Sequence, residues 1–129
     1  MRFGYTILYV RNVAASVALY ERAFGQRTRF VHESGDYAEL ETGGTVLAFA
    51  SHELAESNLG DAFRRAPGDA PATPFEVCFV TEDVSGAYEQ ALRGGAESVT
   101  APHSTPWGQD VAYVRDPDGN LIELASPAT

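Results

Sequence analysis

The first apolar run of the chain alternates in the manner of a strand and is followed by a helical repeat. Residues 5–10 are rich in aromatic and β-branched side chains, which favour extended structure. Apolar residues then recur at helical spacing over residues 13–24. Asn12 suits a helix N-cap, and Gly25 suits a helix end. The pattern therefore predicts a strand followed by a helix.

Three further strand-like stretches follow this helix. Residues 37–41 and 45–50 are separated by Thr-Gly-Gly at 42–44, which predicts a hairpin. Residues 27–32 are expected to form another strand before this hairpin. The first half of the chain is thus predicted to have the order βαβββ.

The second half repeats this order. Residues 75–80 are a strand-like run, Asp83 suits an N-cap, and residues 84–93 are amphipathic up to the glycines at 94 and 95. Three more strands are expected, over residues 96–100, 111–115 and 121–125, the last two joined by the Asp-Pro-Asp-Gly turn at 116–119.

Superposing the two halves aligns their elements. Setting Tyr5 on Glu76 also sets Asn12 on Asp83, and the hairpins match when Ala48 is set on Glu123. We therefore predict an α+β fold, a single domain of residues 1–129 made of two tandem βαβββ units. The units cover about 1–50 and 75–129, and the connector 51–74 has one short helix near 52–57.

Strand periodicity separates two faces of the predicted sheets. One face is purely apolar and is expected to lie under the helices as the core. Its residues are Leu8, Val10, Leu40, Leu47, Phe49, Val77, Phe79, Val114, Ile122 and Leu124. The other face is mixed, aromatic and acidic, and lines a cup if the two curved sheets close together with the helices outside. Its residues are Tyr5, Ile7, Tyr9, Glu39, Ala48, Glu76, Cys78, Tyr113 and Glu123.

Composition narrows the classes of function. The 129 residues carry a formal net charge of -9, and all nine basic residues are arginine, so lysine-dependent Schiff-base and P-loop chemistry is excluded. The acidic surface disfavours nucleic acid and attracts cationic small molecules. The single cysteine, Cys78, permits neither an intramolecular disulfide nor a cysteine-based zinc motif. With no membrane-length apolar run and no secretory signal, we expect no membrane association and a cytoplasmic location.

Three segments of the chain resemble the vicinal oxygen chelate superfamily. They are YTILYVRNV at 5–13, YERAFG at 20–25 and VRDPDGNLIEL at 114–124. The superfamily includes glyoxalase I, extradiol dioxygenases, fosfomycin-modifying enzymes and bleomycin-resistance proteins. The resemblance covers nearly the whole chain and implies paired βαβββ units around a cup. It also implies a homodimer.

In the metalloenzymes of that superfamily, four side chains in the cup hold a divalent ion. The resemblance places these positions at Tyr5, Ala48, Glu76 and Glu123. Alanine has no donor atom, and a neutral tyrosine is a poor ligand. The three histidines, His32, His52 and His103, lie elsewhere. The resemblance therefore favours the bleomycin-resistance branch, without a full metal site and with antibiotic resistance as the implied role.

Three classes of function remain open from the sequence. The first is a metal-independent protein that sequesters a cationic or aromatic small molecule. The alternative is a glyoxalase- or dioxygenase-like lyase or isomerase that uses Glu76 and Glu123 as an acid/base pair or as weak ligands of a divalent metal. An interaction module without a ligand is the third class. The expected ligand-binding residues are Tyr5, Tyr9, Glu39, Glu76, Trp107, Tyr113 and Glu123.

Overall fold

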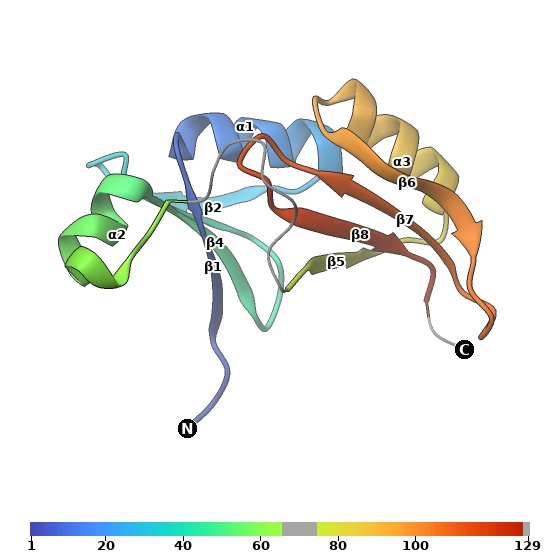
Figure 1. The fold of residues 1–129 in the computed structure, drawn as a ribbon, viewed down its shortest axis with the longest axis horizontal. Coiled ribbons are helices and arrows are strands. Elements are labelled where there is room, and N and C mark those ends of the chain that lie inside the picture. The colour runs from blue at the N-terminus through green and yellow to red at the C-terminus, as the bar shows by residue number, and fades with distance from the viewer. Residues whose placement is uncertain (66–74, 128–129) are drawn as a thin grey trace. The chain divides into compact units, whose positions relative to one another are not determined.

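The computed structural model describes residues 1–65 and 75–127 (Figure 1). The chain divides into two units, Met1–Arg65 and Ala66–Thr129. Each unit has a four-stranded mixed sheet with a helix between its first two strands. The predicted α+β fold of two βαβββ-like units is therefore confirmed. None of the helices in the described ranges is long and apolar enough to span a membrane.

The first unit has its sheet in the order β1-β4-β3-β2. Strand β1 runs parallel to β4, and the other neighbours are antiparallel. Its elements are β1 (Tyr5–Val10), α1 (Val13–Phe24), β2 (Thr28–Val31), β3 (Tyr37–Leu40), β4 (Val46–Ser51), α2 (His52–Leu59) and the 3-10 helix η1 (Gly60–Ala62).

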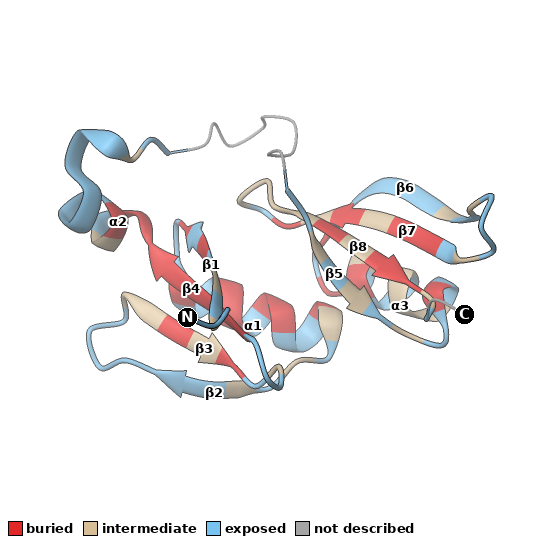
Figure 2. Cartoon of the chain, turned by 90° about the horizontal axis from the view of Figure 1, so that it is seen from below, coloured by how far each residue is buried: buried red, intermediate tan, exposed pale blue. Residues whose placement is uncertain are grey.

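Local sequence explains where α1 begins and ends and how it packs. The side chain of Asn12 accepts a hydrogen bond from the Ala15 amide, and Gly25 adopts the left-handed conformation, with φ of 63°, that ends the helix. Tyr20 is fully buried and its ring centroid lies 4.7 Å from that of Phe49 on β4. Every residue of β4 is buried (Figure 2), so this central strand and α1 together form the core of the unit.

The second unit repeats the arrangement with the sheet order β5-β8-β7-β6. Strand β5 runs parallel to β8, and Asp83 caps the helix by accepting from the Gly86 amide at 2.9 Å. The helix packs against β6, β7 and β8. The elements are β5 (Val77–Val80), α3 (Val84–Arg93), β6 (Glu97–Ser104), β7 (Asp110–Arg115) and β8 (Leu121–Ala125).

Four details differ from the predictions. Strand β6 continues to Ser104 rather than ending at 100, and α2 continues to Leu59 rather than ending near 57. Val77 and Phe79 are half-buried rather than core residues, because α3 packs mainly on β6, β7 and β8. Glu76 lies just before β5 instead of inside it. The grouping into one domain stays a prediction, and part of the connector, 66–74, lies outside the described residues.

Candidate functional site

The sheet face of the second unit that carries polar side chains forms the candidate site. Buried and half-buried residues alternate along much of β7 and β8 (Figure 2), so one face packs on α3 while the other carries Tyr113 and Glu123. The register pairs Glu123 with Cys78 on β5 and with Tyr113 on β7. Glu76 lies two residues before Cys78. The strand alternation in the sequence predicted that these four residues share one face. The structure places them close together on the second sheet.

Three groups that can donate a proton converge on the carboxylate of Glu123. The Tyr113 hydroxyl donates to Oε2 of Glu123 at 3.1 Å. Glu76 and Cys78 are the other two, and the negative charge of Glu123 acts on both. The Cys78 thiol itself donates to the carbonyl of Phe79 at 3.9 Å. Because a carboxylate has about four lone-pair positions, Glu123 can accept further hydrogen bonds besides the one from Tyr113. The cluster is thus an acidic site built from three strands and the residue before β5.

The environment of this cluster raises the pKa of each donor. Burial raises the pKa of Glu76, and the negative charge of Glu123 and the hydrogen bond to it act in the same direction. The same causes raise the pKa of Cys78 to about 11 and that of Tyr113 to about 12, with burial again the largest. Two carboxyl groups that share a hydrogen bond keep a proton to higher pH than isolated ones do. The cluster therefore holds its protons tightly unless a cation replaces one.

The thiol of Cys78 gives a direct test of this environment. Because thiolate is the reactive form and the pKa is about 11, alkylation by iodoacetamide is expected to be slow near neutral pH and to rise up to about pH 11. Glu123→Gln removes a neighbouring negative charge and should speed labelling at mildly alkaline pH, about tenfold for each pKa unit recovered. Mass spectrometry measures the rates, with Cys78→Ser as the unlabelled control. Labelling of the wild type as fast as an unstructured cysteine would contradict this environment.

The first unit contains a different acidic site around Glu39. The Tyr37 hydroxyl donates to Oε2 of Glu39 at 2.8 Å, and Arg29 lies 4.0 Å from Glu39 and from Glu41. Burial and the contact with Glu39 raise the pKa of Tyr37. Glu39, an expected ligand-binding residue, is therefore already engaged by a hydroxyl and a guanidinium. Tyr37 was absent from the expected site, although its two-residue spacing from Glu39 on a strand places both on one face.

The expected aromatic residues have different surroundings. Tyr5 is 54% exposed on β1, and Tyr9 is 40% exposed with its ring centroid 5.1 Å from that of Phe63. Trp107 is 70% exposed in the turn between β6 and β7, where its indole N–H donates to Gln109 at 2.8 Å. Tyr5, Tyr9 and Glu39 belong to the first unit, and Trp107 to the second. A common cup that contains them all stays a prediction.

The four expected ligand positions do not supply four metal donors. Ala48 is completely buried on β4, where it pairs with Ile7 on β1 and with Glu39 on β3. Its side chain has no donor atom for a metal. In the second unit, Glu76 and Glu123 offer two carboxylates, and Glu123 accepts a hydrogen bond from Tyr113. Within residues 1–65 and 75–127, no group of three or more His, Cys, Asp or Glu side chains has the geometry of a metal site.

Comparison with known proteins agrees with this fold. The model of the Glyoxalase/Bleomycin resistance protein/Dioxygenase superfamily matches residues 2–124, and the chain therefore belongs to that superfamily. It is 30% identical over 118 residues to YraH of Bacillus subtilis (strain 168), an uncharacterized protein, with 91% of each chain covered. The superfamily is thus established, whereas the relative gives no activity.

Solved structures show the same fold. A glyoxalase-related enzyme from Fulvimarina pelagi has a TM-score of 0.85 at 20% identity, over 98% of this chain and 88% of that one. A glyoxalase/bleomycin resistance protein/dioxygenase family enzyme from Burkholderia phytofirmans PsJN has a TM-score of 0.79 at 23% identity, over 95% of this chain and 96% of that one. At these identities the likeness concerns the fold alone, so function has to be argued from the site.

Proposed function

We propose that this chain is a metal-independent small-molecule binding protein, similar in role to bleomycin-resistance proteins, whose ligand is a cationic aromatic compound. The observation that carries the proposal is the pair of carboxyl groups of Glu76 and Glu123 beside Tyr113 on the polar face of the second sheet, close enough for the charge of Glu123 to raise the pKa of Glu76. Tyr113 adds a ring and a hydroxyl to the same place. Antibiotic resistance follows only if the natural ligand is an antibiotic.

The chemistry of the pair suits an ammonium group. An alkylammonium has several N–H donors, so it can replace the proton that Glu76 retains and donate to the carboxylates of both Glu76 and Glu123. Charge-assisted hydrogen bonds of this kind are stronger than neutral ones. The face of the Tyr113 ring can add a cation–π contact. The net charge of -9 also attracts cations from solution.

Binding of a cation is expected to depend on pH with a defined sign. Glu76 is neutral below its raised pKa and negatively charged above it, so the site gains one negative charge as pH rises through that pKa. Affinity for tryptamine should therefore rise as pH increases through this pKa, with release of a proton on binding. Calorimetry of chelator-treated protein in two buffers of different ionisation enthalpy measures that proton.

The neutral analogue tryptophol provides the matched control. It has the same indole ring but a hydroxyl in place of the ammonium, so it should bind more weakly and release no proton. Equal affinities for tryptamine and tryptophol would contradict the proposal. Loss of tryptamine binding after chelation, with recovery on addition of a divalent ion, would contradict its metal-independent part.

The raised pKa of Glu76 also supports a second candidate function. A carboxylic acid with a raised pKa keeps its proton to higher pH and can act as a general acid, and a neighbouring carboxylate such as Glu123 can act as the base. A lyase or isomerase would use this pair for proton transfer. Turnover of a thiol adduct, a catechol or an epoxide that Glu123→Gln abolishes would favour the enzyme over the binding protein. The assay is run with and without added Mg²⁺, Mn²⁺, Zn²⁺ or Ni²⁺.

A further inference from the structure

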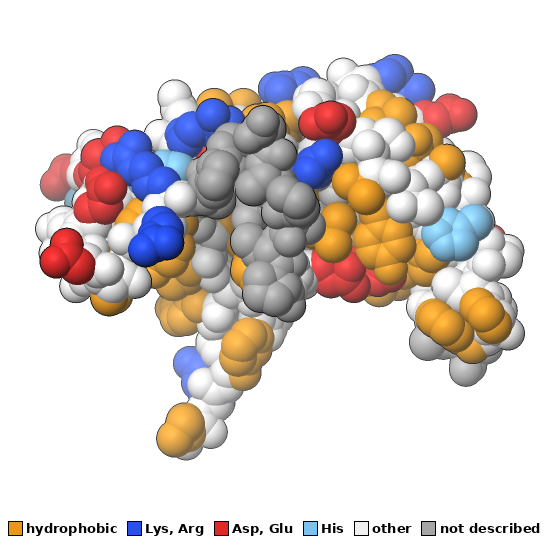
Figure 3. Space-filling view, viewed as in Figure 1, with side chains coloured by type: hydrophobic (Ala, Val, Ile, Leu, Met, Phe, Trp, Pro, Cys, Tyr) orange, Lys and Arg blue, Asp and Glu red, His pale blue; other side chains and the backbone are white. Residues whose placement is uncertain are grey.

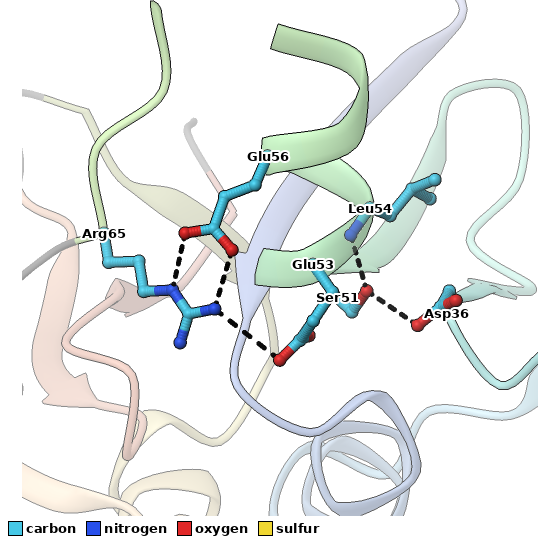
Figure 4. Close-up of polar contacts among 6 residues, drawn as sticks. All are labelled: Asp36, Ser51, Glu53, Leu54, Glu56 and Arg65. Carbon is cyan, nitrogen blue, oxygen red and sulfur yellow. Dashed lines mark hydrogen bonds and ion pairs between the residues drawn. The ribbon is translucent and has the colours of Figure 1, made fainter. Parts of the chain in front are cut away.

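A segment of the first unit, residues 52–65, follows β4 and lies against β1 and β4 through α2. We call this segment the strap. Its beginning is held firmly, because the Ser51 hydroxyl accepts from the Leu54 amide at 3.0 Å and donates to Asp36 at 2.8 Å (Figure 4). The strap therefore starts from a fixed point on the sheet.

The outer part of the strap is held mainly by surface charges. Arg65 donates two hydrogen bonds to Glu56, at 3.0 and 2.7 Å, and lies 3.6 Å from Glu53 (Figure 4). Acidic and arginine side chains gather over this end of the unit (Figure 3). Residues 56–62 are all exposed. Because exposed ion pairs contribute little and few apolar groups are buried here, this part can open without unfolding the sheet.

The last part of the strap places an aromatic ring close to two others. The Phe63 centroid lies 5.1 Å from the Tyr9 ring, edge to face, and 5.9 Å from the His52 ring. His52 is 6% exposed, and its Nδ1 atom is buried with no hydrogen-bond partner in the described part of the chain. A buried nitrogen without a hydrogen bond lowers the stability of the folded protein. Such an atom needs an explanation, and a ligand that supplies the missing bond is one.

We propose that Phe63 is the internal occupant of an aromatic subsite formed by Tyr9 and His52, and that a planar nitrogen heteroaromatic compound displaces it. The compound's ring takes the place of the Phe63 ring. Its ring nitrogen or N–H forms the hydrogen bond that Nδ1 of His52 lacks. The benzyl side chain of Phe63 can supply the ring contacts but not this bond, which gives the ligand its advantage. This subsite requires nothing from Glu76 or Glu123.

Indazole is a suitable probe because it is neutral and carries both a donor and an acceptor nitrogen. Indene has the same shape without either. Phe63→Ala removes the internal competitor and should strengthen indazole binding by about tenfold, since the apparent affinity is reduced by the fraction of closed protein. The same substitution should strengthen the binding of indene less, because indene cannot form the hydrogen bond with His52. Chemical-shift titration of the His52 ring measures both, and Phe30→Ala, at an exposed ring on β2, is the control.

Arg65→Gln offers a second test that leaves the ring in place. It loosens the strap, so indazole binding should strengthen by up to about fivefold. Weaker or unchanged indazole binding in both variants would overturn the proposal, as would equal gains for indazole and indene. Binding of tryptamine that depends on Glu123 is measured separately, so failure here is distinguishable from failure of the proposed function.

Discussion

Replacing Glu123 by Gln is expected to weaken tryptamine binding by about 10- to 100-fold. A hydrogen bond to a charged group contributes about 1.5 to 3 kcal/mol, and about 1.4 kcal/mol corresponds to a factor of ten. Gln keeps the shape of Glu and can still accept from Tyr113, but it has no charge to offer an ammonium group. Isothermal titration calorimetry with wild type and variant measures the loss, and the weak binding of tryptophol should barely change.

Glu97→Gln is the matched control for this effect. Glu97 is exposed on β6, and the substitution changes the net charge of the protein by the same amount. If Glu97→Gln weakens tryptamine binding as much as Glu123→Gln does, the attraction comes from the overall charge and not from the site. Unchanged affinity in Glu123→Gln would remove this residue from the site altogether.

The largest expected effect on stability comes from Phe49→Ala, which should lower the free energy of unfolding by about 3 to 5 kcal/mol. Phe49 is fully buried in the central strand β4, where its ring contacts that of Tyr20. The substitution leaves a cavity that residues on the sheet and helix cannot fill without moving. Urea denaturation followed by circular dichroism measures the change.

Phe30→Ala is the comparison for stability, because Phe30 is 44% exposed on the edge strand β2. It should cost less than about 1 kcal/mol. A similar small cost for Phe49→Ala would mean that β4 and α1 do not form the core as described.

The elements that could be predicted from the sequence are those set by local signals. Asn12 and Asp83 cap their helices as expected, since an N-cap depends on a few neighbouring residues. The predicted end of β6 at residue 100 was wrong, because a proline such as Pro102 is disfavoured inside a sheet but is tolerated on an edge strand. Strand β6 is an edge strand, and it stays paired with β7 past Pro102. Two irregularities interrupt the register of this pair, one of them between Thr100 and His103.

Strand periodicity predicted which residues of the candidate site share a face, but not their contacts. Alternation placed Glu76, Cys78, Tyr113 and Glu123 on one face, where Tyr113 donates to Glu123 and the charge of Glu123 raises the pKa values of Glu76 and Cys78. The contacts of Glu39 depend on neighbouring strands and on side-chain rotamers, so they could not be read from its own strand. Closure of two sheets into one cup depends on contacts between the units, which no local pattern sets. The cup, the homodimer and the cytoplasmic location remain predictions.

Carboxyl-carbon NMR of the glutamates, titrated against pH with and without tryptamine, examines the acidic pair most directly. If an ammonium group takes the place of the proton that Glu76 retains, the resonances of Glu76 and Glu123 will both shift on binding, and the raised pKa of Glu76 will fall. Tryptamine that binds while both resonances and their titration stay unchanged would contradict the account.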